Sequence, residues 1–179
     1  MKVHKLFAWL AAAAAFALAL VVVVFVPVDA GITEVRTEAD IARARGEVYQ
    51  YVTTPANWPR WHPSSVAVIG DATHSLVVGE SVVEEFKVAG QHGFVTWRVI
   101  GRETDRLWRI EGQIDGHLAG VITYTLSDKD GGTHFDRQFE YPSRTLLFAI
   151  LNALTLRERV IAESEQALAQ LRTVLDTKP

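Results

Sequence analysis

The chain has 179 residues, which is room for one domain of ordinary size. It is 49% hydrophobic and 22% charged, which excludes a wholly disordered protein, and its lack of cysteine excludes disulfides, zinc fingers, iron–sulfur clusters and thiol catalysis. After the apolar N-terminal run, 16 basic and 21 acidic residues give a net charge of −5 without a basic cluster, which argues against nucleic acid as the main partner.

Residues 6–26 form an uncharged apolar run of 21 residues. As a helix it is about as long as the hydrocarbon core of a bilayer is thick, roughly 30 Å. A cleaved signal peptide is one interpretation, because Lys2 and Lys5 precede the run and Val28-Asp29-Ala30 resembles a cleavage site. An uncleaved transmembrane anchor over residues 1–28 is favoured, because the apolar part of a signal peptide usually spans about 7–15 residues.

The charges that flank this run predict its orientation. Lys2 and Lys5 precede it, whereas Asp29 and Glu34 follow it. Because positive charge tends to stay on the cytoplasmic side, we expect a single-pass cell-membrane protein with its C-terminal domain outside the cytoplasm. Cleavage would instead give a secreted or periplasmic domain.

The next segment predicts a strand followed by short helices. Residues 32–41 alternate between apolar or small side chains and charged ones, which is typical of a half-buried strand. A short helix is expected at residues 43–53. Pro55 can begin a further helical turn, and Pro59 and Pro63 exclude a long one.

Six strand-like segments follow, and the later ones are separated by turn signals such as Asp115-Gly116 and Asp130-Gly131. The short spacing between them predicts hairpins and therefore an antiparallel meander. The expected strands are residues 65–70, 80–88, 94–102, 106–114, 118–127 and 133–141.

A long helix is expected after Pro142, with Ser143 as its N-cap. Its first half, residues 146–156, is apolar on more than one face. We expect one side, which includes Leu151, to close a ligand cavity and another side to contact the membrane or a partner. Leu151→Asp is accordingly expected to destabilise the fold.

These elements predict an α+β fold, because a seven-stranded sheet with one apolar face needs a cover and only the last helix is large enough. The expected architecture is a curved antiparallel sheet wrapped on the long C-terminal helix, with two short helices after the first strand. A cavity is expected between the sheet and the long helix.

The order of these elements and the segment VYQYVTTPANWPRWHP at residues 48–63 resemble the SRPBCC or START-like superfamily, in its polyketide cyclase/dehydrase form. The resemblance covers residues 32–176. It implies the helix-grip fold and an apolar ligand held between the sheet and the C-terminal helix. It transfers no catalytic residues and no cofactor, since members differ in activity.

The sequence contains few candidates for reactive groups. The five histidines after the apolar run are scattered without metal-ligand spacing, so no metal site is expected, and no nucleophile motif is present. Glu84 and Glu85 lie next to each other on an expected strand, so at most one carboxylate points inward. That residue could act as a general base, although a solvated charge at the sheet edge is the interpretation we favour.

Aromatic and aliphatic residues of the expected strands are candidates for the cavity wall. Trp58 and Trp61 have two possible roles. Their rings could form a rigid lip at the cavity mouth, or they could fill the core beneath the short helices, which is the interpretation we favour. The wall candidates are Trp97, Trp108, Ile110, Ile122, Tyr124 and Phe139.

Arg137 is the polar residue most expected to bind a ligand. It shares one side of an alternating strand with Phe135, Phe139 and Tyr141, so it faces the cavity if the aromatic rings do. A buried arginine does not readily lose its charge and needs an anionic or carbonyl partner. That partner is expected to be either Glu84 or the head group of a ligand. A shifted strand register, or a side chain that reaches out to the rim, is the alternative.

The function expected from these features is membrane-anchored binding of a hydrophobic or amphipathic small molecule, with lipids among the candidates. The alternatives are an enzyme of cyclase or dehydratase type and a cell-envelope interaction module whose cavity is filled by side chains. The sequence specifies neither the ligand nor the oligomeric state.

Overall fold

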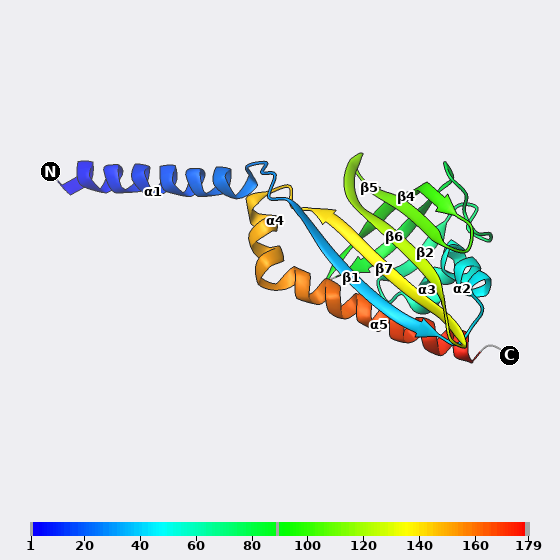
Figure 1. Cartoon of the computed structure of the whole chain (residues 1–179). Coiled ribbons are helices and arrows are strands. Elements are labelled where there is room, and N and C mark those ends of the chain that lie inside the picture. The colour runs from blue at the N-terminus through cyan, green and yellow to red at the C-terminus, as the bar shows by residue number, and fades with distance from the viewer. Residues whose placement is uncertain (1, 89, 178–179) are drawn as a thin grey trace.

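A single seven-stranded antiparallel sheet dominates the computed structural model, which describes residues 2–88 and 90–177 and, in the first helix, the side chains of residues 7–21 and 23 only (Figure 1). The strand order is β1-β7-β6-β5-β4-β3-β2, so each hairpin expected from the sequence pairs neighbouring strands and β1 closes against β7. The expected α+β architecture is confirmed. The strands are β1 Ile32–Ile41, β2 Ser65–Ile69, β3 Ser81–Val88, β4 Gln91–Glu103, β5 Leu107–Ile114, β6 His117–Lys129 and β7 Gly132–Pro142.

The C-terminal helix α5, Arg157–Asp176, runs across one face of this curved sheet (Figure 1). Its buried residues recur at helical spacing, so one apolar stripe faces the sheet. They are Ser164, Ala167, Leu168, Leu171 and Leu175.

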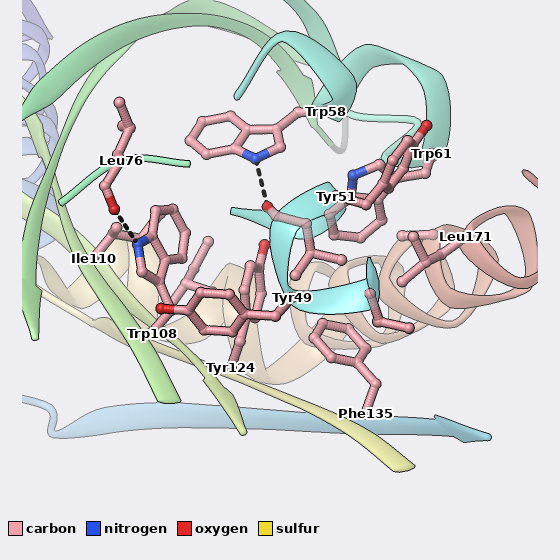
Figure 2. Packing of buried hydrophobic residues seen from close by; sticks show 14 of the residues in the cluster. Tyr49, Tyr51, Trp58, Trp61, Leu76, Trp108, Ile110, Tyr124, Phe135 and Leu171 are labelled. Carbon is pink, nitrogen blue, oxygen red and sulfur yellow. Dashed lines mark hydrogen bonds between the residues drawn. The ribbon is translucent and has the colours of Figure 1, made fainter. Parts of the chain in front are cut away.

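Along the chain, β1 and β2 are connected by two short helices, α2 (Arg45–Val52) and α3 (Trp58–Trp61). The 3₁₀ turn η1 (Pro55–Asn57) lies between these helices. Trp58 is 4% exposed and its indole Nε1 donates to the carbonyl of Val52 at 3.0 Å (Figure 2). Trp61 is fully buried. Both indoles therefore pack in the core, as the favoured interpretation predicted.

The expected single C-terminal helix is in fact two helices joined by a π-helical turn. These are α4 (Leu146–Leu151), η2 (Asn152–Leu156) and α5. Thr145, not the expected Ser143, is the N-cap, because the Oγ1 of Thr145 accepts from the amide of Phe148 at 3.1 Å. The chain changes direction between α4 and α5 (Figure 1). A buried asparagine, Asn152, stabilises this bend. Its Oδ1 accepts a hydrogen bond from the hydroxyl of Tyr141 on β7, and its Nδ2 donates one to Oγ1 of Thr33 on β1, each at 2.8 Å.

The N-terminal helix α1, Lys2–Phe25, projects away from the sheet beside α4 (Figure 1). Pro27 forms an isolated bridge with Thr145, and the amide of Val28 donates to the carbonyl of Arg144 at 3.0 Å. The side chains of Lys2 and Lys5 lie outside the described residues. No helix of the described part is long and apolar enough to cross a membrane, so the expected transmembrane helix is not supported.

Candidate functional site

A cavity of about 580 Å³ lies between the sheet, the segment around α3, and the helices α4 and α5. Its wall is mostly apolar and comes from the rows of side chains on β3 to β7 that point toward α5. Eight of the residues expected at this site border it, namely Trp61, Glu84, Trp97, Ile110, Ile122, Tyr124, Arg137 and Phe139.

Two expected wall residues, Trp108 and Leu151, do not border the cavity. Trp108 is fully buried because the rings of Tyr124 and Trp58 cover it, with centroids 5.5 and 6.2 Å away (Figure 2). Its Nε1 donates to the carbonyl of Leu76 at 3.1 Å, so it belongs to the packed core. Leu151 is 42% exposed on α4, whose direction differs from that of α5 because of the π-helical turn. Both predictions were therefore wrong.

A pair of glycines accommodates the aromatic floor of the cavity. Gly112 on β5 and Gly120 on β6 lie opposite each other in the sheet. A Cβ atom on Gly112 would lie 2.6 Å from Cζ3 of Trp97, and one on Gly120 would lie 2.6 Å from Cε2 of Phe139. The absence of these side chains lets both rings rest against the backbone, which keeps the space above them open.

The inner end of the cavity contains a buried cation. Arg137 is 3% exposed, and its side chain faces the cavity as the strand alternation predicted. Its Nη1 donates to the hydroxyl of Ser164 on α5 at 3.2 Å, and its Nη2 lies 3.3 Å from Nε2 of His62. Its Nε–H has no hydrogen-bond partner among the described residues.

His62 follows α3 and completes this polar end. Removal from water, together with the charge of Arg137, lowers the pKa of His62 to about 3. The imidazole is therefore neutral at physiological pH, and its Nε2 can accept a hydrogen bond from Arg137.

Glu84 contributes a carboxyl group to the same cavity. Its Oε2 accepts from Nε1 of Trp97 at 2.6 Å, and burial raises its pKa against the opposing effects of Ser65, Trp97 and Arg137. Glu85 points the other way and pairs with His92 at 2.7 Å. The favoured interpretation of Glu84 as a solvated edge charge was wrong, because β3 directs it inward rather than to solvent.

The expected direct pair between Glu84 and Arg137 is not formed. Among the described residues, no carboxylate lies within 4.0 Å of the Arg137 guanidinium. Tyr124 lies beside it instead, and burial raises the pKa of Tyr124 to about 12, so its hydroxyl stays protonated.

Four polar residues near Arg137 border the cavity without having been predicted from the sequence: His62, Ser64, Glu163 and Ser164. The hydroxyl of Ser64 donates to Oε2 of Glu163 at 2.7 Å, which links the segment after α3 to α5. These residues come from a loop and a helix, where no two-residue alternation reports which way a side chain points. The one available signal was the position of His62 inside the segment at residues 48–63.

The mouth of the cavity lies beside α4. The exposed residues of its border are at strand ends or just before α4, namely Gln91, Ile114, His117 and Arg144. Phe148 of α4 and Leu156 of the π-helical turn line the inside. The side chains of Ile150, Leu151 and Leu154 are exposed. The apolar first half of the helix thus divides between the cavity and the surface.

The sequence profile of the family described as polyketide cyclase / dehydrase and lipid transport matches residues 33–176. A comparison with curated proteins gave no match.

Solved structures with the same fold are numerous. A protein from Chromobacterium violaceum is 18% identical with a TM-score of 0.61 over 81% of this chain and 98% of its own. A Staphylococcus aureus protein of unknown function is 13% identical, with a TM-score of 0.65, and the match covers 82% of this chain and 95% of that protein. The Aha1 protein of Colwellia psychrerythraea, solved as a dimer, is 15% identical, with a TM-score of 0.58, and the match covers 81% of this chain and 97% of that protein. At these identities the likeness shows the helix-grip fold alone.

Proposed function

This chain belongs to the polyketide cyclase/dehydrase and lipid transport family, and we propose that its cavity binds one hydrophobic or amphipathic small molecule. The observation that carries the proposal is an apolar cavity of about 580 Å³ with a few polar groups gathered at one end. Ligand pockets of drug-sized molecules have volumes of about 300–1,000 Å³ and the same division of apolar and polar groups. An open cavity also favours ligand binding over an interaction module with a filled interior.

The hydrophobic effect would supply most of the affinity. Each Å² of apolar ligand surface removed from water contributes about 25 cal/mol. The aromatic floor formed by Trp97 and Phe139 supplies such surface, and the one polar group of these two side chains, the indole N–H of Trp97, already donates to Glu84.

The most direct experiment is native mass spectrometry of the full chain after gentle purification, followed by extraction of any bound molecule. We expect one apolar or amphipathic molecule per chain. A chain that carries no small molecule, and that takes up none from a mixture of lipids and apolar metabolites, would refute the proposal.

Membrane attachment is a separate part of the proposal, and it is supported by the uncharged run at residues 6–26. Thr145, which bridges to Pro27 after α1, also borders the cavity, so an anchored α1 would hold the cavity mouth near the bilayer. Ligands that partition into the membrane would then reach the site at high local concentration. The flanking charges favour a location outside the cytoplasm.

Alkaline extraction of membranes from cells that express the full chain tests this attachment. We expect the intact chain to stay in the membrane pellet. A soluble mature protein that begins at Gly31 would show instead that residues 1–30 are a cleaved signal peptide.

An enzyme of cyclase or dehydratase type is the second candidate, because titratable groups converge on the cavity. Glu84, with its raised pKa, and neutral His62 are both able to take part in proton transfer. Incubation of the protein with the molecule that it binds distinguishes the two functions. A binder returns the molecule unchanged, whereas a dehydratase returns it lighter by one water.

A further inference from the structure

The guanidinium of Arg137 is a buried charge with no carboxylate within 4.0 Å among the described residues. Its hydrogen-bond partners Ser164 and His62 are neutral, and so is the protonated hydroxyl of Tyr124 beside it. An arginine carries five N–H donors and cannot be deprotonated in a protein. Burial of such a charge is costly unless an anion accompanies it.

The nearest candidate within the chain is otherwise engaged. Glu84 borders the same cavity, but its Oε2 accepts from the indole of Trp97. Burial disfavours the ionised form of its carboxyl group, as the raised pKa records. The second carboxyl group that borders the cavity, Glu163, accepts a hydrogen bond from the hydroxyl of Ser64 at 2.7 Å.

We propose that Arg137 binds the carboxylate of an amphipathic monocarboxylic acid, whose apolar tail runs along the cavity toward α4. This inference rests on the proposed function, since it requires that the cavity hold a small molecule.

A carboxylate fits this end better than other head groups. The planar guanidinium matches a carboxylate with two parallel hydrogen bonds. Arg137 supplies one positive charge at this end of the cavity, so a singly charged carboxylate balances it, whereas a doubly charged phosphate would leave a buried negative charge uncompensated. An ammonium head would be repelled by Arg137 itself.

A row of aromatic rings defines the direction of the tail. Cζ of Arg137 lies 5.6 Å from the ring centroid of Phe139. The ring of Phe139 lies 5.1 Å from that of Tyr141, which lies 6.3 Å from that of Phe148 on α4. All four residues border the cavity. They form a continuous apolar path from the cation to the mouth.

The test uses the full chain and four probes of equal chain length: dodecanoate, dodecanol, dodecyl phosphate and dodecylammonium. Calorimetric titration below the aggregation concentration of each probe gives the affinities. We expect dodecanoate to bind about 30-fold or more tightly than the other three, which is the effect of one buried, hydrogen-bonded charge pair.

Substitutions of Arg137 test whether this residue causes the preference for dodecanoate. Arg137→Leu should abolish the preference for dodecanoate while it leaves dodecanol affinity unchanged, and the thermal midpoint should hold or rise because an uncompensated charge is removed. Arg137→Lys retains the charge but not the fork and should retain part of the preference, which covers the case in which Arg137→Leu fails to fold. Arg98→Leu, an exposed arginine on β4, is the control and should bind as the wild type does.

The possible results separate the two proposals. If dodecanoate and dodecanol bind equally and Arg137→Leu changes neither, the carboxylate site is refuted and the apolar binding function stands. If dodecyl phosphate binds as tightly as dodecanoate, the preference for a single charge is refuted. If the wild type binds none of the four probes, the carboxylate site is refuted and the proposed function loses support, which the native mass spectrum then tests independently.

Discussion

At the scale of single residues, the polar end of the cavity depends on keeping one group neutral and its neighbour charged. His62 and Arg137 lie 3.3 Å apart, and two cations at that distance would repel each other. Burial lowers the pKa of His62, and the charge of Arg137 lowers it further. The arrangement is therefore complete at neutral pH and is destabilised when acid protonates the imidazole.

His62→Gln tests this coupling, because glutamine retains an acceptor but does not titrate. An unfolded histidine has a pKa of about 6.5, so between that value and about 3 the unfolded wild type binds more protons than the folded one. Wild-type stability should therefore be complete above about pH 6.5 and decline as the pH falls. The contribution lost between pH 7 and pH 5 is on the order of 1–2 kcal/mol.

Denaturant unfolding of both proteins at pH 7 and pH 5 measures this contribution. The variant should lose less stability than the wild type over that interval. Parallel losses in the two proteins would show that His62 is not the titrating group.

At the scale of elements, the paired glycines of β5 and β6 are what keep the cavity floor low. Gly112→Ala would place a Cβ atom 2.6 Å from the ring of Trp97, so the indole must move toward the cavity and away from Glu84. We expect a loss of about 1–3 kcal/mol in the free energy of unfolding, as for other overpacked sites.

Gly101→Ala on β4 is the matched control, since its nearest atoms would lie 3.5 Å away or more and its backbone is ordinary for an L-residue. Urea unfolding should show little change for Gly101→Ala and a clear loss for Gly112→Ala. Equal effects of the two substitutions would mean that the ring of Trp97 does not depend on the glycine.

The helix α4 is the second element with a specific consequence. Because Leu151 is 42% exposed, Leu151→Asp should change the free energy of unfolding by no more than about 0.5 kcal/mol, contrary to the destabilisation expected from the sequence. Leu171→Asp, at a fully buried position of α5, should unfold the domain. A large loss of stability in Leu151→Asp would show that α4 packs against the domain more closely than the structure has it.

At the scale of the whole molecule, the features that depend on strand periodicity could be predicted from the sequence. Alternation along residues 133–141 placed Arg137 and Phe139 on the cavity side, and the short turns predicted the antiparallel order of β3 to β7. Both follow from the two-residue repeat of a strand, which is a local property.

Features that depend on packing between distant segments could not be predicted in this way. Ser164 meets Arg137 only because α5 crosses β7, and the burial of Trp108 depends on which rings cover it. The bend at Asn152 has no helix breaker in the sequence, because its causes are hydrogen bonds to β1 and β7. The predicted pair between Arg137 and Glu84 was wrong for the same reason, since the Glu84 carboxyl group accepts from Trp97 instead.

The central claim is that the cavity is the binding site for an apolar molecule. Ala119 borders it, whereas Ala162 is exposed on α5, so Ala119→Phe and Ala162→Phe add the same ring inside and outside the cavity. The decisive measurement is a titration of the full chain and both variants with the neutral apolar fluorophore N-phenyl-1-naphthylamine, with thermal melts to verify folding. We predict one site per chain in the wild type and in Ala162→Phe, and the loss of most of this binding in Ala119→Phe. Undiminished binding by folded Ala119→Phe, with the same affinity and stoichiometry, would contradict the claim.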